Sequence, residues 1–76
     1  MRRFILYRHN PPATHTEGHY ANPPEEPQLE GCEFGDGTVA VRWCTPLRST
    51  SLWADFDTFD KVHGHPEYSS ELVWLD

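Results

Sequence analysis

The fold is decided by residues 29–44, LEGCEFGDGTVAVRWC, in which two strand-like segments flank Gly35-Asp36-Gly37. An Asp-Gly pair between alternating apolar residues is a strong hairpin signal, because a two-residue type I′ turn needs positive φ at both central positions. With Asp36-Gly37 as that turn, Phe34 opposes Val39. The pattern predicts a hairpin whose inner, apolar face carries Cys32, Phe34, Val39, Val41 and Trp43.

Three more segments have the composition of strands. Residues 3–9 are apolar and aromatic, residues 48–53 follow a turn at Thr45-Pro46, and residues 71–75 are rich in apolar side chains. Alternation across the turn at Thr45-Pro46 places Thr50 and Leu52 on the inner face, with Trp53 pointing outward or lying at the end of the sheet.

One helix is expected, at residues 55–63. Asp55 can cap its first turn, and Phe56 and Phe59 recur at helical spacing, whereas Gly64 and Pro66 provide a stop signal. Together these elements predict an α+β fold in the order β-β-β-β-α-β. We expect a small antiparallel sheet of four to five strands with the helix packed on one face.

The length and composition indicate one domain, residues 1–76. A chain of 76 residues buries only about 60% of the surface that its unfolded form exposes, but ten aromatic residues enlarge the thin core. Five of the seven prolines lie in residues 10–28, which lack apolar periodicity. We expect an irregular Pro-rich loop there, because long loops without secondary structure are uncommon in compact domains and are often functional or disordered.

The charge balance restricts the partners. Six basic residues stand against twelve acidic ones, for a net charge of -6, and the basic residues are scattered. Nucleic acid is therefore an unlikely partner, because such binders concentrate positive charge. No apolar run reaches the ~20 residues of a membrane span, and the first apolar run is too short for a signal peptide. We expect a cytoplasmic protein with no membrane partner.

Cys32 and Cys44 are expected to be free thiols. In the predicted hairpin, Cys44 lies about three positions beyond the residue that faces Cys32, or roughly 10 Å along the strand. A disulfide tolerates at most about 7 Å between Cα atoms. Alternation also places the two thiols on opposite faces, with Cys32 in the core.

The histidines and hydroxyls do not form a convincing reactive site. His15 and His19, and His63 and His65, have spacings that zinc ligands can use, but the first pair would share a metal only on a helix. Ser49-Thr50-Ser51 lacks the elbow and the oxyanion donor that a nucleophile requires. We expect no catalytic residue, no metal and no cofactor.

Several motifs from Glu30 onward resemble those of a known set of proteins. They are EG-x-EF-x-DGTV-x-x-RW at 30–43, ST-x-x-W at 49–53, VHGH at 62–65 and WLD at 74–76, with FILYR at 4–8 as a fitting opening. The set consists of small, uncharacterised proteins of actinobacteria, their phages and haloarchaea. The resemblance implies no activity, since none is assigned in that set, but it suggests a phage or prophage context. The Pro-rich segment at 10–28 departs from the pattern.

These observations favour a non-enzymatic interaction protein, a phage-type accessory or regulatory protein that binds a bacterial host protein in the host cytoplasm. The alternatives are a nucleic-acid-binding or transcription-modulating module and, third, a small metal-dependent hydrolase. An edge strand of an open sheet would also allow a homodimer. The candidate contact residues are Tyr20, Arg42, Trp53, His63 and His65.

Overall fold

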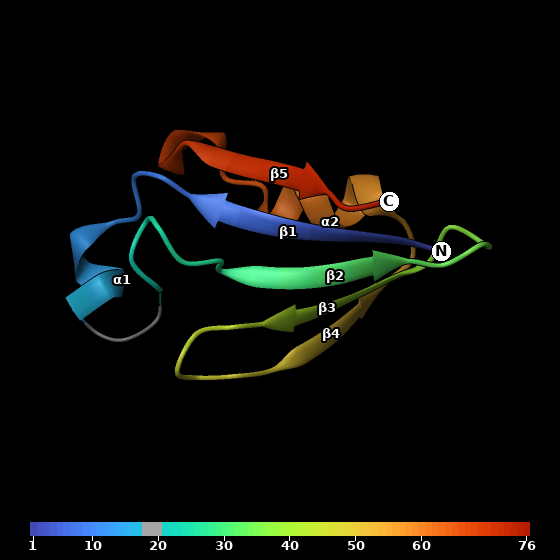
Figure 1. The fold of residues 1–76 in the computed structure, drawn as a ribbon, viewed down its shortest axis with the longest axis horizontal. Helices are drawn as coiled ribbons and strands as arrows, with labels where there is room; N and C mark the ends of the chain where they lie inside the picture. Colours follow the sequence, from blue (N-terminus) through green and yellow to red (C-terminus); the bar gives the residue numbers. More distant parts are fainter. Residues whose placement is uncertain (18–20) are drawn as a thin grey trace.

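Five strands form one antiparallel sheet in the order β4-β3-β2-β1-β5 (Figure 1). The computed structural model describes residues 1–17 and 21–76. The strands are β1 (Arg2–Arg8), β2 (Leu29–Glu33), β3 (Val39–Trp43), β4 (Thr50–Trp53) and β5 (Ser70–Trp74). The helices are α1 (Ala13–Glu17), α2 (Phe56–His63) and the 3-10 turn η1 (Pro66–Tyr68). The predicted α+β class is confirmed.

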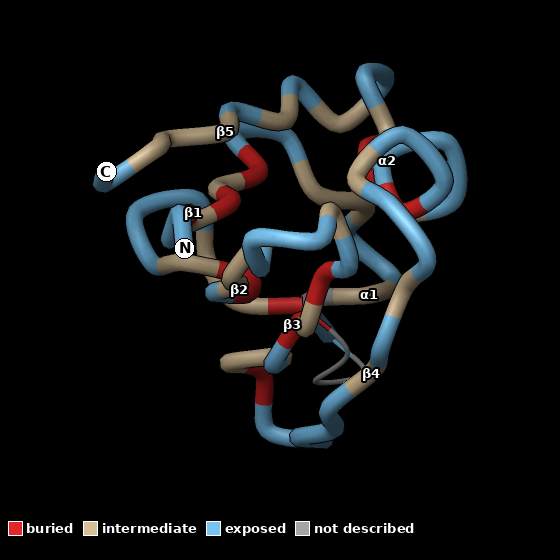
Figure 2. Tube along the Cα trace, turned by 90° about the vertical axis from the view of Figure 1, so that its right-hand side faces the viewer, coloured by how far each residue is buried: buried red, intermediate tan, exposed pale blue. Residues whose placement is uncertain are grey.

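Helix α2 packs on one face of the sheet, which we call the inner face (Figure 2). Its start is fixed by Asp55, whose side chain accepts a hydrogen bond from the Thr58 N–H at 2.7 Å, as the sequence predicted. Phe59 is the residue of α2 that is buried in the core. The buried apolar side chains that surround it are Phe4, Leu6, Leu29, Val39 and Val41.

Aromatic rings fill the space between α2 and the sheet. The Phe4 ring meets Phe56 edge-on at 5.5 Å and Trp74 at 5.2 Å between centroids. Gly31 is the cross-strand partner of Phe4, and a Cβ added at Gly31 would overlap the Phe4 ring. The large Phe4 ring therefore lies over a backbone position of β2 that has no side chain, which gives the ring room beneath α2.

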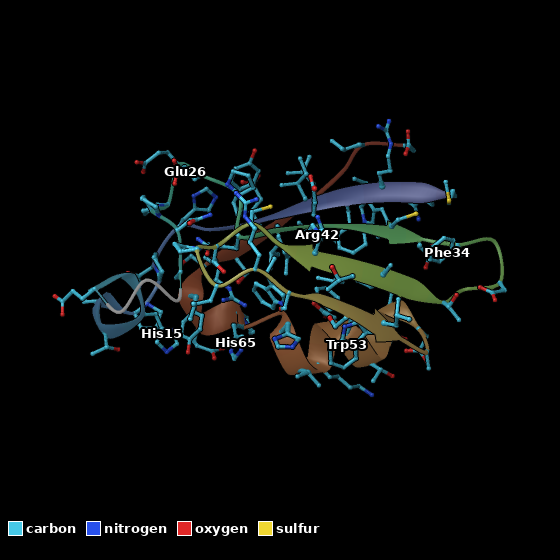
Figure 3. All side chains as sticks on the ribbon, turned by 90° about the horizontal axis from the view of Figure 1, so that it is seen from below. His15, Glu26, Phe34, Arg42, Trp53 and His65 are labelled. Atoms are coloured by element: carbon cyan, nitrogen blue, oxygen red, sulfur yellow. The ribbon has the colours of Figure 1, made fainter. Side chains whose placement is uncertain are left out.

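The β2–β3 hairpin differs from the prediction by one residue in register. Glu33 faces Val39 and Cys32 faces Ala40, and the loop closes with Gly37 N–H donating to the Phe34 carbonyl at 2.9 Å. Gly37 alone in this loop has positive φ, at 90°, so the type I′ turn was wrong. The three-residue loop reverses which side chains of β2 face inward. Val39, Val41 and Trp43 of β3 face inward as predicted, but Cys32 of β2 faces outward. Phe34 is 40% exposed and lies near the end of the hairpin (Figure 3).

The faces of β4 are also the reverse of the prediction. Trp43 N–H donates to the Ser49 carbonyl, and Val39 pairs with Trp53. Trp53 therefore lies on the inner face, on the same side of the sheet as α2 (Figure 3), whereas Leu52 points outward and is 79% exposed. The error came from assuming an unbroken alternation across the turn between the two strands.

The Pro-rich segment is more ordered than the sequence indicated. Residues 13–17 form the short helix α1, which lies at one end of the sheet (Figure 1). Gln28 is fully buried, its backbone N–H donates to the Leu6 carbonyl at 2.8 Å, and its side chain bonds both backbone polar groups of Asn22. The described part of this segment is thus attached to the sheet at the start of β2.

Both cysteines are free thiols. The expected separation along the strands holds, but the expected placement on opposite faces was wrong. Cys32 faces outward opposite Ala40. Cys44 lies on the same side, because the charges of Glu30 and Arg42, two outward residues, act on its thiol. Burial raises the pKa of the Cys44 thiol. Cys32 is therefore a surface residue of the sheet and not part of the core.

Candidate functional site

The face of the sheet opposite α2, here called the outer face, is covered by no helix in the described part of the chain (Figures 1 and 2). The strand registers place alternate side chains of all five strands on it. Its apolar members are Ile5, Tyr7, Cys32, Ala40, Leu52, Val73 and Leu75. Antiparallel sheets often leave one face in water, but that face is then mostly polar. This one is apolar at its centre.

A shallow hollow of about 400 Å³ lies on the outer face between β5 and β4. Ile5, Cys32 and Ala40 line its middle, and Leu75 lies at the β5 side with 47% of its surface exposed. The small side chain of Ala40 leaves this space open at the middle of the outer face. An apolar side chain from another molecule could enter it and displace water.

An ion pair borders the hollow where β1 begins. The Arg3 guanidinium donates to both carboxylate oxygens of Asp76, at 2.8 and 2.9 Å, and the Arg3 backbone N–H also donates to this carboxylate. These hydrogen bonds hold the pKa of the Asp76 carboxyl far below its usual range. Arg3 is therefore fixed in position, which lowers the entropy it would lose in contacting a partner.

A second polar pair lies at the other end of β1. His9 Nε2 and Glu71 Oε1 are 2.8 Å apart, and the His9 ring stacks on Tyr7. Tyr7 is the one aromatic side chain that the described strands place on the outer face. The outer face is thus apolar in the middle and polar at both ends of β1, an arrangement common to protein interfaces.

Of the predicted contact residues, Arg42 lies on the outer face. Its Nε donates to Thr50 Oγ1 of β4 at 3.2 Å, and Glu30 of β2 is its cross-strand partner on the other side. Both Arg42 and Glu30 line the hollow. Arg42 therefore lies beside the apolar residues of the hollow, although no sequence pattern relates it to Ile5 or Leu75.

The structure does not bring the other predicted contact residues to this face. Trp53 and His63 pack together on the inner side, with ring centroids 5.3 Å apart. His65 lies just beyond the end of α2, where its ring stacks on Tyr68 and its Nδ1 is 2.8 Å from Glu67 Oε1. Tyr20 lies outside the described residues.

The residues that sequence reasoning missed come from the first and last strands. Arg3, Ile5 and Tyr7 alternate with buried side chains along β1. Val73 of β5 and Leu75 just after it alternate with partly buried side chains that pack on the core. This alternation was a usable signal, but both segments are so apolar that either parity could have faced the core. Only the pairing of Phe4 with Trp74 across the two strands decides it.

No group of three or more metal-binding side chains occurs within residues 1–17 and 21–76. His15 lies on α1, where its ring meets Tyr68 edge-on, while His19 is not among the described residues. Over the same ranges, no helix has the length and hydropathy needed to cross a membrane.

Comparison with known proteins identifies one family. Residues 29–76, from the first residue of β2 onward, match the family model described as Acb5 phage protein. The match covers four of the five strands and α2. No curated protein and no solved structure matches the chain.

Proposed function

Since the chain belongs to the Acb5 phage protein family, we propose that it is a phage accessory protein that acts by binding a host protein and not by catalysis. The proposal includes an actinobacterial host and a site of action in its cytoplasm. The observation that carries it is the open outer face, where an apolar hollow lies beside a fixed ion pair.

The charges on the outer face indicate which kind of protein surface would be complementary to it. By register, the strands place two arginines there, Arg3 and Arg42, and two glutamates, Glu30 and Glu71. The charges that the strands place on this face are therefore balanced, with Asp76 beside Arg3 as one further carboxylate, whereas the whole chain has a net charge of -6. It suits an apolar protein patch with charges of both signs around it, and not a strongly basic surface.

The nucleic-acid alternative has less support. Single-stranded nucleic acid is bound by aromatic side chains that stack on bases, beside a positively charged groove. Trp43 and Trp53 contact His63 on the inner side, and Trp74 contacts Phe4 there. The outer face offers Tyr7 alone among aromatic residues of the described strands, and its charge is balanced.

The test compares variants as baits for proteins of an actinobacterial lysate. Ala40→Glu fills the hollow with a charge, and Leu75→Glu places a charge at its border. Val62→Glu on α2 is the matched control, because Val62 is 48% exposed and Leu75 is 47% exposed. A captured protein is then purified and its affinity for each variant is measured by titration calorimetry.

The proposal predicts a defined complex with the wild-type chain and with Val62→Glu. Ala40→Glu and Leu75→Glu should each weaken it by at least about 30-fold, since burying an unpaired charge costs several kcal/mol. Circular dichroism establishes that each variant is folded. Equal affinities for all four chains would overturn the outer face as the binding site, and an absence of any specific complex would overturn the proposed function.

A further inference from the structure

Strand β4 is an edge strand with unused backbone hydrogen-bonding groups. Trp43 and Ser49 form a hydrogen-bonded pair, so the alternation of antiparallel ladders makes Ser51 and Trp53 the next residues of β4 bonded to β3. The N–H and C=O groups of Thr50 and Leu52 therefore point away from the sheet. In Figure 1 no other described element lies beyond β4.

Most of the usual protections of an edge strand are missing from β4. Natural sheets guard their edges with short strands, charged residues, prolines, bulges or a covering segment, and β4 has only the first of these, with four residues. The sequence of β4 is TSLW, without charge or proline, and its register with β3 has no bulge. The opposite edge strand, β5, carries Glu71. Of the two edges, β4 is thus the one open to another strand.

Charges at the two ends of β4 have opposite signs. Arg48 precedes the strand and Asp55 follows it. When two copies of such a strand pair antiparallel, the arginine of each copy comes next to the aspartate of the other. Strand β5 carries Glu71 and no basic residue, so two copies of β5 would pair without such complementary charges. The charge pattern of β4 therefore favours a second copy of the same chain as its partner.

We propose that two copies of this protein pair through β4, joining their sheets into one continuous antiparallel sheet. The two-fold axis passes at Ser51, so Thr50 of each copy faces Leu52 of the other and both exchange backbone hydrogen bonds. In this register Arg48 faces Ala54 of the second copy, next to its Asp55. The two exposed Leu52 side chains become diagonal neighbours on the outer face.

The dimer is expected to be weak. A four-residue strand buries far less than the roughly 1,200 Å² of a stable interface, so a dissociation constant on the order of 100 µM is expected. Dimerisation brings two outer faces side by side on one surface. A partner with two copies of the apolar patch would then bind more tightly than the single face allows.

Sedimentation equilibrium of the full chain from about 10 µM to 1 mM measures this association. Thr50→Pro removes an N–H that the monomer does not use, at the first residue of an edge strand, where proline is tolerated. We expect the wild type to show a monomer–dimer equilibrium and Thr50→Pro to remain a monomer. Circular dichroism verifies that Thr50→Pro is folded.

The charge contacts give a second test that does not alter the backbone. Arg48→Glu places a glutamate beside Asp55 of the other copy and should weaken the dimer about tenfold or more. Adding Asp55→Asn to Arg48→Glu removes that repulsion but keeps a side chain able to cap α2, so part of the association should return.

Lys61→Glu on α2 is the control, because it changes the net charge by the same amount away from β4. A wild-type chain that stays monomeric to 1 mM would overturn the proposal. So would a dimer that Thr50→Pro and Arg48→Glu leave unchanged, or one that Lys61→Glu weakens as much as Arg48→Glu does.

Discussion

Arg8 is the one buried cation among the described residues, with 6% of its surface exposed. Its Nη2 donates to the carbonyl of His63 at 2.9 Å, at the end of α2. The end of a helix carries partial negative charge and unpaired carbonyls, so this contact stabilises the buried guanidinium without a carboxylate. The rings of Trp43 and Tyr68 lie 5.5 Å away on the same group. Arg8 thus joins β1 to the end of α2.

The environment at the end of α2 also lowers the pKa of His63. Its ring lies between Trp43 and Trp53, with centroid distances of 5.1 and 5.3 Å. Burial lowers the pKa of His63, and the positive charges of Arg8 and His65 lower it further. The sequence predicted His63 as a contact residue, but the structure places it against the core, where its neutral form is favoured.

This shift predicts a loss of stability in mild acid. Below pH ~6.5 the unfolded chain binds a proton at His63 before the folded chain does, so the free energy of unfolding falls as the pH decreases. The slope from this residue is at most about 1.4 kcal/mol per pH unit. Urea unfolding between pH 7.5 and 5.5 measures it, above the range where the carboxylates titrate. His63→Phe should flatten the profile, and an unchanged slope would show that another group is responsible.

Among the secondary-structure elements, the helix ends could be predicted from local sequence signals, but the register of the strands could not. The ends of α2 follow from Asp55 and Gly64, whose effects act within one helical turn, so the predicted helix was nearly correct. The faces of β2 depended on whether the loop after it has two or three residues. A difference of one residue inverts every side chain of a strand, and Gly35-Asp36-Gly37 is compatible with both loops.

The same hairpin depends on Gly31 for its packing against β1. A methyl group at Gly31 would overlap the Phe4 ring, which Phe56, Phe59 and Trp74 keep from moving. Gly31→Ala should therefore reduce the free energy of unfolding by about 1–3 kcal/mol, as overpacking does in other cores. Chemical denaturation measures the change.

Phe4→Leu provides the matching half of a double-mutant cycle with Gly31→Ala. The smaller side chain gives the new methyl group room, so the double variant should lose less stability than the sum of the two single variants. Strict additivity would contradict a direct contact between Gly31 and Phe4, and with it the register of β1 on β2.

At the scale of the whole molecule, composition and pattern predicted the α+β class because an aromatic helix face and apolar strands have few ways to combine. They did not predict the open face, since that depends on the pairing of β1 with β5, which are far apart in the sequence. The charge-balanced outer face belongs to a chain with a net charge of -6, so the acidic excess lies on other surfaces. The proposed binding face is therefore less acidic than the rest of the molecule, as a partner patch with charges of both signs would require.

The reactivity of the Cys32 thiol tests most directly whether the outer face is open. In a Cys44→Ser chain, modification by a small maleimide is timed in native buffer and in urea. An open outer face predicts a native rate within about tenfold of the unfolded rate, because Cys32 lines the surface hollow. If Cys32 instead faced α2, it would react only on unfolding, slower by a factor of about 1,000 or more for an ordinary domain stability. Protection of that size would contradict the open face and the function proposed from it.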